Sequence, residues 1–183
     1  MQNYSKLSHA GKTHLSKAKQ PKKSKKSEKK EPLWSMLPER HRDVLLLLKD
    51  CGLKFKFHNE NDSISCTEDW DTNVMGRFSC RNRDCSSRGW PSKAIAMIIR
   101  LYPNARYNAR IYHQRCIKCN TPGRLEEVDE SYTERVSYWL KRWSGVQVEA
   151  PQHSYKKTRA PHRKDLCEGC KAGHCKLGKQ TGF

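Results

Sequence analysis

The fold is decided by Lys93-Ala-Ile-Ala-Met-Ile-Ile-Arg-Leu-Tyr102, then Pro103-Asn-Ala105, then Arg106-Tyr-Asn-Ala-Arg-Ile-Tyr-His-Gln-Arg115. Both faces of the first segment are mostly apolar, which predicts a strand at the centre of a sheet. The middle segment predicts a turn, and the last alternates as a strand does. The sequence therefore predicts a β-hairpin. With its turn centred near Asn104, residue 92 lies opposite residue 116.

This hairpin brings two pairs of cysteines together. Cys80-x4-Cys85 lies before its first strand, and Cys116-x2-Cys119 follows its second strand. Zinc prefers four thiolate or imidazole ligands in a tetrahedron, and two short loops normally supply two each. We therefore expect Cys80, Cys85, Cys116 and Cys119 to form a zinc-ribbon-like site, although an x4 loop is less standard than x2.

A second ligand set lies near the C-terminus. Cys167, Cys170 and Cys175 lack a fourth partner, and the preceding His162 supplies one. His153 and His174 compete for this position, and Cys66 is a substitute for a ligand of the first site. Two occupied sites lower the formal net charge from +18 to about +15, because each bound cysteine is a thiolate.

Helices and further strands flank the hairpin. Ser35 is expected to cap a helix that ends near Lys49 before Gly52, and Asp129 or Ser131 a second helix that Gly145 closes. The second helix carries a stripe of large side chains that we assign to the core: Tyr132, Val136, Trp139, Leu140 and Trp143. The remaining expected segments are strands at 53–58 and 75–80 and an acidic loop at 59–73. The predicted fold class is α+β, a small zinc-ribbon-like antiparallel sheet with flanking helices and two structural zinc sites.

The positive charge concentrates at the two ends of the chain. Of the net +18, residues 1–32 contribute +8, residues 33–152 contribute +4 and residues 153–183 contribute +6. The first segment has no Trp, Phe, Ile or Val, so we expect a disordered Lys-rich arm there. We expect the zinc-binding domain at 33–176 and a short basic tail at 177–183.

The N-terminal composition also bears on location. The N-terminus has no apolar signal segment, and no run approaches the roughly eighteen apolar residues of a membrane span. We therefore expect an intracellular protein, in cytoplasm or nucleus, whose cysteines are reduced. The lysine run at 19–30 fits a nuclear import signal or a nucleic-acid contact; a solvated tail is the alternative.

With these residues in place, the chain resembles the 3CxxC-type zinc-binding domain family, in particular its tailless fungal form. The resemblance rests on the segments 71–78, 87–90, 107–116 and 161–175, together with Trp34-Ser-Met, the Phe-containing strand ending in His58 and Trp143-Ser-Gly145. It implies zinc binding, with the family's characteristic histidine at His162. Receptor-transporting proteins and zygote arrest proteins are more distant relatives. The former assist membrane receptors to the cell surface and the latter bind RNA.

Two functions compete. The first is a non-enzymatic zinc module that binds RNA or another nucleic acid through basic residues of the arm and of the first cysteine loop: Lys22, Lys23, Lys25, Lys26, Arg77, Arg81, Arg83 and Arg88. Phe78 and Trp90 would then stack bases, or else simply pack the hairpin. The second is a protein-interaction adaptor or chaperone-like trafficking factor, marked by an exposed apolar or acidic patch.

Catalysis is not expected. His58-Asn-Glu60 and Cys116-x2-Cys119 resemble parts of a zinc deaminase motif, but Arg115 stands where that motif has Pro. Both metal sites already have four ligands, which leaves no position for an activated water.

Overall fold

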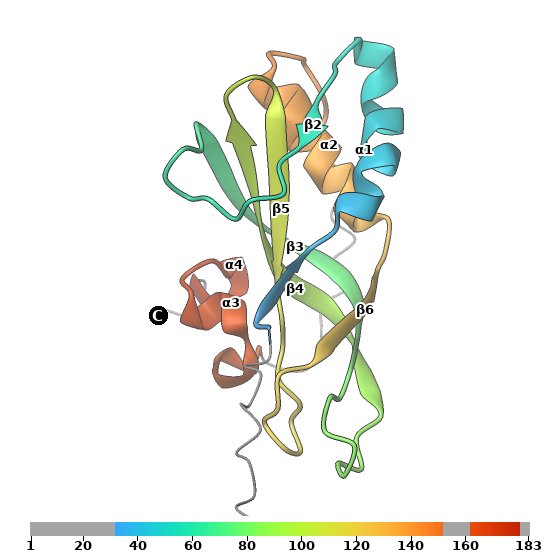
Figure 1. Cartoon of the computed structure of the whole chain (residues 1–183), viewed down its shortest axis with the longest axis vertical. Helices are drawn as coiled ribbons and strands as arrows, with labels where there is room; N and C mark the ends of the chain where they lie inside the picture. Colours follow the sequence, from blue (N-terminus) through green and yellow to red (C-terminus); the bar gives the residue numbers. More distant parts are fainter. Residues whose placement is uncertain (1–31, 152–161, 180–183) are drawn as a thin grey trace, which may run out of the picture. The chain divides into compact units, whose positions relative to one another are not determined.

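The computed structural model describes residues 32–151 and 162–179, all within the compact unit Glu31–Phe183 (Figure 1). Its centre is a curled sheet in the order β1-β5-β4-β3-β6, with β2 pairing with β5 off this path. The strands are β1 Trp34–Met36, β2 Lys56–Phe57, β3 Glu68–Ser79, β4 Gly89–Tyr102, β5 Arg106–Tyr112 and β6 Arg124–Val128. The α-helices are α1 His41–Leu48, α2 Ser131–Trp143, α3 Glu168–Lys171 and α4 Lys176–Lys179.

The predicted α+β class and the predicted hairpin are confirmed. β4 and β5 pair antiparallel from Tyr102↔Arg106 to Met97↔Ile111, the register in which residue 92 would face residue 116. β4 lies between β5 and β3, at the centre of the sheet. Among the described residues, no helix is long and apolar enough to cross a bilayer.

The two faces of β4 bury two different layers. Ile95, Met97 and Ile99 are fully buried beneath α1 and α2, whose Val44, Leu48, Tyr132, Val136 and Leu140 complete the main core. Ala96 and Ile98 face the opposite way and pack against Cys167, Cys175 and Leu177 of the C-terminal segment. Alternation along one strand therefore fixes which segment covers which face of the sheet.

The N-terminal segment departs from the prediction. Ser35 does not cap a helix, because it lies in β1, where it pairs with Ile111 of β5. A single 3₁₀ turn, Pro38–Arg40, intervenes before α1, and a second, Lys49–Cys51, ends at Gly52 with φ 65°. Pairing with β5 prevails over the capping preference of Ser35, and Pro38 begins the helical segment instead.

The acidic loop predicted at 59–73 is confirmed for residues 59–67 and wrong for residues 68–73. Glu68–Asn73 belong to β3 and pair with Leu101–Ala96 of β4. β6 pairs only with Gly76–Ser79, so the first half of β3 is an edge of the sheet. Charged side chains are common on such edges, where they discourage pairing with other chains. The predicted strand at 53–58 is shorter than expected, with only β2 in regular pairing.

The second helix matches its expected position. It begins at Ser131, but the predicted cap by Asp129 or Ser131 is wrong, because Glu130 holds the N-cap position and makes no side-chain cap hydrogen bond. Asp129 instead accepts a hydrogen bond from the Ser131 amide at 3.0 Å, just before the helix. Tyr132, Val136 and Leu140 are fully buried, as the predicted core stripe requires. Trp139 and Trp143 are partly buried at its margin.

A buried histidine holds β1 against the end of β5. His113 is 1% exposed, and its Nδ1 donates to the Pro32 carbonyl at 2.9 Å. Nε2 therefore accepts from the Ser35 hydroxyl at 2.7 Å, which fixes one neutral tautomer. Burial lowers the pKa of His113 to about 4.

This lowered pKa predicts a pH dependence of stability. The unfolded chain binds a proton at His113 near pH 6.5, whereas the folded chain resists it down to about pH 4, so stability falls as pH drops through this window. The loss approaches about 3 kcal/mol for the wild type and is absent for His113→Gln. Urea unfolding of both zinc-loaded proteins at several pH values measures it. Because zinc ligands also protonate in acid, the difference between the two profiles is the test; a constant difference would contradict the assignment.

Candidate metal centres

The first centre lies where β3 ends, where β4 begins and beyond the end of β5. Cys80 follows β3, Cys85 precedes β4, and Cys116 and Cys119 follow β5. The Cys80 and Cys119 sulfurs are 3.5 Å apart and those of Cys85 and Cys116 are 3.8 Å apart. All four Sγ atoms lie within 4.8 Å of one another. The x4 loop of the first pair thus still directs both thiols to one point.

Backbone geometry shapes the loops of this centre. Asn120 adopts φ 57°, a left-handed conformation that Asn tolerates, and its amide donates to the Cys116 carbonyl at 2.8 Å. The Ser87 amide donates to the Cys85 sulfur at 3.4 Å. Such amide contacts stabilise thiolate charge and fix the ligand orientation.

The second centre joins His162 to the C-terminal turns. His162 Nε2 lies 3.1 Å from the Cys170 sulfur and 3.5 Å from that of Cys175. With Cys167, these ligand atoms also fall within 4.8 Å of one another. The centre packs on the face of β4 opposite the main core.

The two glycines near this centre have different roles. Gly173 has φ 79°, as expected of a sharp turn before Cys175. Gly169, by contrast, lies inside α3, and a Cβ there would come within 2.3 Å of the Ala96 Cβ. Close approach to β4, rather than a turn, therefore explains Gly169.

The donor sets suit zinc in chemistry and in spacing. Tetrahedral zinc with bonds of about 2.3 Å to sulfur places two thiolates about 3.8 Å apart, which matches the sulfur separations of the first centre. All nine cysteines are free thiols in the structure. Four thiolates, or three thiolates and an imidazole, form closed structural sites. The expected pair of structural zinc sites is confirmed.

Each centre contains a thiol that ionises readily. Hydrogen bonding by Thr121 lowers the pKa of Cys119 to about 6, and hydrogen bonding by Cys167 lowers that of Cys175 to about 5. Burial raises the pKa of Cys80 to about 12. Because the thiolate is the form that binds metal, a first thiolate is present in each centre near neutral pH.

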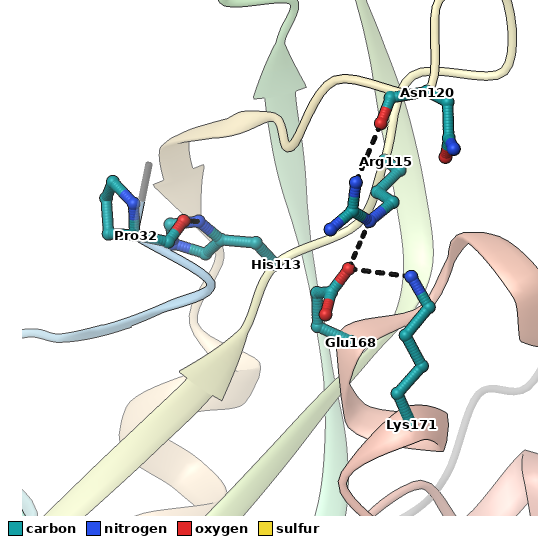
Figure 2. Close-up of polar contacts among 6 residues, drawn as sticks. All are labelled: Pro32, His113, Arg115, Asn120, Glu168 and Lys171. Atoms are coloured by element: carbon teal, nitrogen blue, oxygen red, sulfur yellow. Dashed lines mark hydrogen bonds and ion pairs between the residues drawn. The ribbon is translucent and has the colours of Figure 1, made fainter. Parts of the chain in front are cut away.

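A buried carboxylate connects the two centres (Figure 2). Glu168 is 6% exposed and accepts from Arg115, which precedes Cys116 of the first centre, and from Lys171 at 2.9 Å. Arg115 also donates to the Asn120 carbonyl at 2.9 Å. Burial alone would raise the pKa of Glu168, but Lys171 and Arg115 together lower it. Sequence reasoning missed this connection, for which an acidic residue between Cys167 and Cys170 was the available signal.

Asp71 anchors the second centre to β3. Its two carboxylate oxygens lie 2.8 Å from His174 Nδ1 and from Lys179 Nζ. The His174 ring also stacks on Tyr112, with centroids 5.6 Å apart. Sequence reasoning placed Asp71 in a loop and therefore missed this contact.

The chain was also compared with known protein families. The family model of the 3CxxC zinc ribbon, described as a zinc-binding domain, matches residues 73–173, more than half of the chain. The chain belongs to the 3CxxC zinc-ribbon family. Comparison with curated proteins and with solved structures gave no significant match. The likeness to the tailless fungal form and to receptor-transporting proteins stays a prediction.

Among the described residues, the competing ligands His174 and Cys66 are not part of either centre of this 3CxxC domain. His174 contacts Asp71 instead of the metal group, and the Cys66 thiol donates to the Ser63 carbonyl at 3.3 Å. Cys51 lies in the 3₁₀ turn that follows α1. His153 lies outside the described residues.

The predicted nucleic-acid contacts divide into three groups. Arg83 and Arg88 are exposed in the loop between Cys80 and β4. Arg77 lies directly opposite Glu127 of β6, and half-buried Arg81 donates to the Gly123 carbonyl at 3.4 Å. Lys22, Lys23, Lys25 and Lys26 lie outside the described part of the chain.

The structure adds two cations to the predicted interface and removes one aromatic residue, Phe78, from it. Lys118 and Arg124 are exposed beside the first centre, and sequence reasoning missed both. Phe78 is fully buried and stacks on Trp90 at 5.6 Å, so Phe78 packs the core and is closed to bases.

The ligand assignment predicts opposite effects for two cysteines. Cys116→Ser removes a buried ligand of the first centre, so bound zinc falls from two ions to one and the melting temperature drops, because structural zinc contributes folding energy. Cys51→Ser, the control, keeps two ions and its melting temperature. Zinc content by mass spectrometry and thermal melting measure both. Equal behaviour of the two variants would refute the assignment.

Proposed function

We propose that this protein is a non-enzymatic zinc module that binds nucleic acid through the loops of the first metal centre. The observation that carries the proposal is the charge of these loops. Residues 81–88 and 115–124 together contain six Arg or Lys and a single acidic residue, Asp84. A zinc bound by four thiolates contributes about −2, so the surface stays positive.

The geometry concentrates this charge on one surface. The Lys118 ammonium donates to the Ser86 hydroxyl at 3.0 Å, which ties the two loops together. Arg83, Arg88 and Lys118 are exposed, so they can reach phosphates. Convergent cations of this kind supply most of the affinity of a protein for the phosphate backbone.

The metal serves structure in this proposal. Each centre has four protein ligands, and a closed site of this kind offers no position for an activated water. Zinc holds the two loops in place, and the loops then present cations at fixed positions.

The proposal predicts a loss of affinity in a charge variant. Arg83→Ala, Arg88→Ala and Lys118→Ala combined weaken binding of full-length protein to nucleic acid by at least about tenfold at 0.15 M salt and reduce the salt slope by two to three, about one per lost cation. The control combines Arg42→Ala, Lys49→Ala and Lys54→Ala, three exposed cations elsewhere. Fluorescence anisotropy over a salt series measures both. Equal affinity of the two variants would contradict the proposal.

A specific surface favours protein interaction as a second function. Leu46 and Leu47 of α1 are 61% and 42% exposed. Leu47 and Glu134 line both of two neighbouring hollows, of about 350 and 520 Å³, between α1 and α2. Asp43 and Glu130 border one hollow, where Arg40 pairs with Asp43 at 3.0 Å, and Glu149 and Lys141 border the other, so carboxylates outnumber cations around the two hollows. Exposed leucines among carboxylates suit a basic amphipathic helix.

This second function predicts selective peptide binding. A Leu/Lys amphipathic peptide binds the full-length protein, and Leu46→Ser weakens it about fivefold, because part of one apolar contact is lost. Calorimetric titration measures the affinity, and a Leu/Glu peptide is the control. Equal binding of the two peptides, or an unaffected Leu46→Ser variant, rules this function out.

A further inference from the structure

A groove separates the two metal centres. β4 and β5 pair regularly only as far as Met97↔Ile111. β4 continues to Gly89 beside the first centre, whereas the chain after β5 turns away and Gln114 bridges to Cys167 of the second centre. The parting of the two strands leaves a groove of about 530 Å³, lined by residues around both centres. This volume is in the range of small-ligand sites.

The floor of the groove is apolar and held in place. Trp90, Ile117, Leu166 and Leu177 line it. The Trp90 ring stacks on Phe78, and its Nε1 donates to Gln114 Oε1 at 3.2 Å. Gln114 in turn donates from Nε2 to the Ser92 hydroxyl at 2.9 Å and to the Ala94 carbonyl at 3.1 Å. A surface fixed in this way loses little conformational entropy when a ligand binds.

The charged residues of the groove are all cationic. Lys93, Arg115 and Arg163 line it, and none of the described lining residues is Asp or Glu. Glu168 neutralises Arg115, and Arg163 pairs with exposed Asp165 at 2.8 Å. Exposed Lys93 makes no ion pair with another described residue. The groove therefore complements a ligand with apolar faces and negative charge.

The groove also continues into the cationic loops of the first centre. Ile117 is 69% exposed and stands between Cys116 and Lys118, so one short loop supplies both an apolar contact and a cation. Ser87 of the groove directly precedes Arg88 in the other loop. A ligand that lies in the groove can thus reach the cations proposed to bind phosphate.

We propose that this groove binds unpaired bases of a single-stranded nucleic acid, an inference that rests on the proposed function and specifies its substrate class. The bases lie against Trp90 and Ile117, while the phosphates contact Lys93 and the loop cations. Single strands expose flat base surfaces that stack on aromatic side chains, whereas a duplex hides them. A duplex can engage the cations but not the apolar floor.

The test compares single and double strands on the full-length protein. Anisotropy titrations use a 12-nucleotide single-stranded RNA, the same sequence as DNA, and the matching duplexes. Wild type binds the single strands at least about fivefold more tightly, and Ile117→Ala lowers single-strand affinity about three- to tenfold without changing duplex affinity. Ile64→Ala, which removes an equally apolar side chain that is 94% exposed and outside the groove, is the matched control. The NMR resonance of the Trp90 indole N–H shifts with single strands and not with duplexes.

The outcomes distinguish failure of this inference from failure of the proposed nucleic-acid binding. Equal affinity for single and double strands, with an unmoved Trp90 resonance but a strong effect of the loop charge variant, overturns the groove and leaves nucleic-acid binding standing. No binding to any strand overturns both. An acidic peptide that shifts the Trp90 resonance when RNA and DNA do not assigns the groove to a protein ligand and also overturns the inference. Preference for RNA over DNA, or the reverse, supports it and identifies the source of the strand.

Discussion

The segment from His113 to Cys116 is the constraint on which both metal centres depend. On one side, the Arg115 amide donates to the Leu166 carbonyl at 2.7 Å and the Glu168 amide to the His113 carbonyl at 3.0 Å. On the other side, the Gln114 carbonyl accepts from the Gly123 amide at 2.8 Å. One edge of this four-residue segment therefore binds the second centre, and its other edge binds the loop of the first centre. The pair Arg115–Glu168 adds a charge contact along the same route (Figure 2).

Apolar packing and zinc coordination stabilise different parts of the domain. The helices α1 and α2 lie at one end of the sheet (Figure 1), and the main core extends from beneath them along the sheet to Phe78. The loops of the first centre hold few apolar residues, and Ile117 among them is exposed. Zinc coordination can order such loops without a core of their own. The loop positions that do not bind zinc can then be Arg or Lys, which a conventional apolar core could not accommodate.

Local sequence patterns predicted the features of the fold and of the metal sites that depend on the alternation of residues and on their spacing. The hairpin, its register and the helix at α2 followed from residues 93–115 and from the stripe at Tyr132, Val136 and Leu140. The donor sets followed from cysteine spacing, and the structure brings all eight predicted donors into two groups. What depends on distant pairing was not predictable. Ser35 favours a helix cap, but its pairing with β5 overrides that preference. The acidic start of β3 has the composition of a loop because only one edge of the strand is paired there, and charged side chains are common on an unpaired edge.

Polar contacts between distant segments escaped sequence reasoning for the same reason. Asp71 and His174, like Arg115 and Glu168, are far apart in the chain, and nothing in either neighbourhood indicates the other. Both carboxylates attach the second centre to the sheet. The groove is a consequence of that attachment, because the part of its floor formed by Leu166 and Leu177 stays in place only while the C-terminal segment remains fixed to β3 and to Arg115. The second zinc site, whose ligands lie outside the cationic loops, therefore shapes the apolar surface beside them.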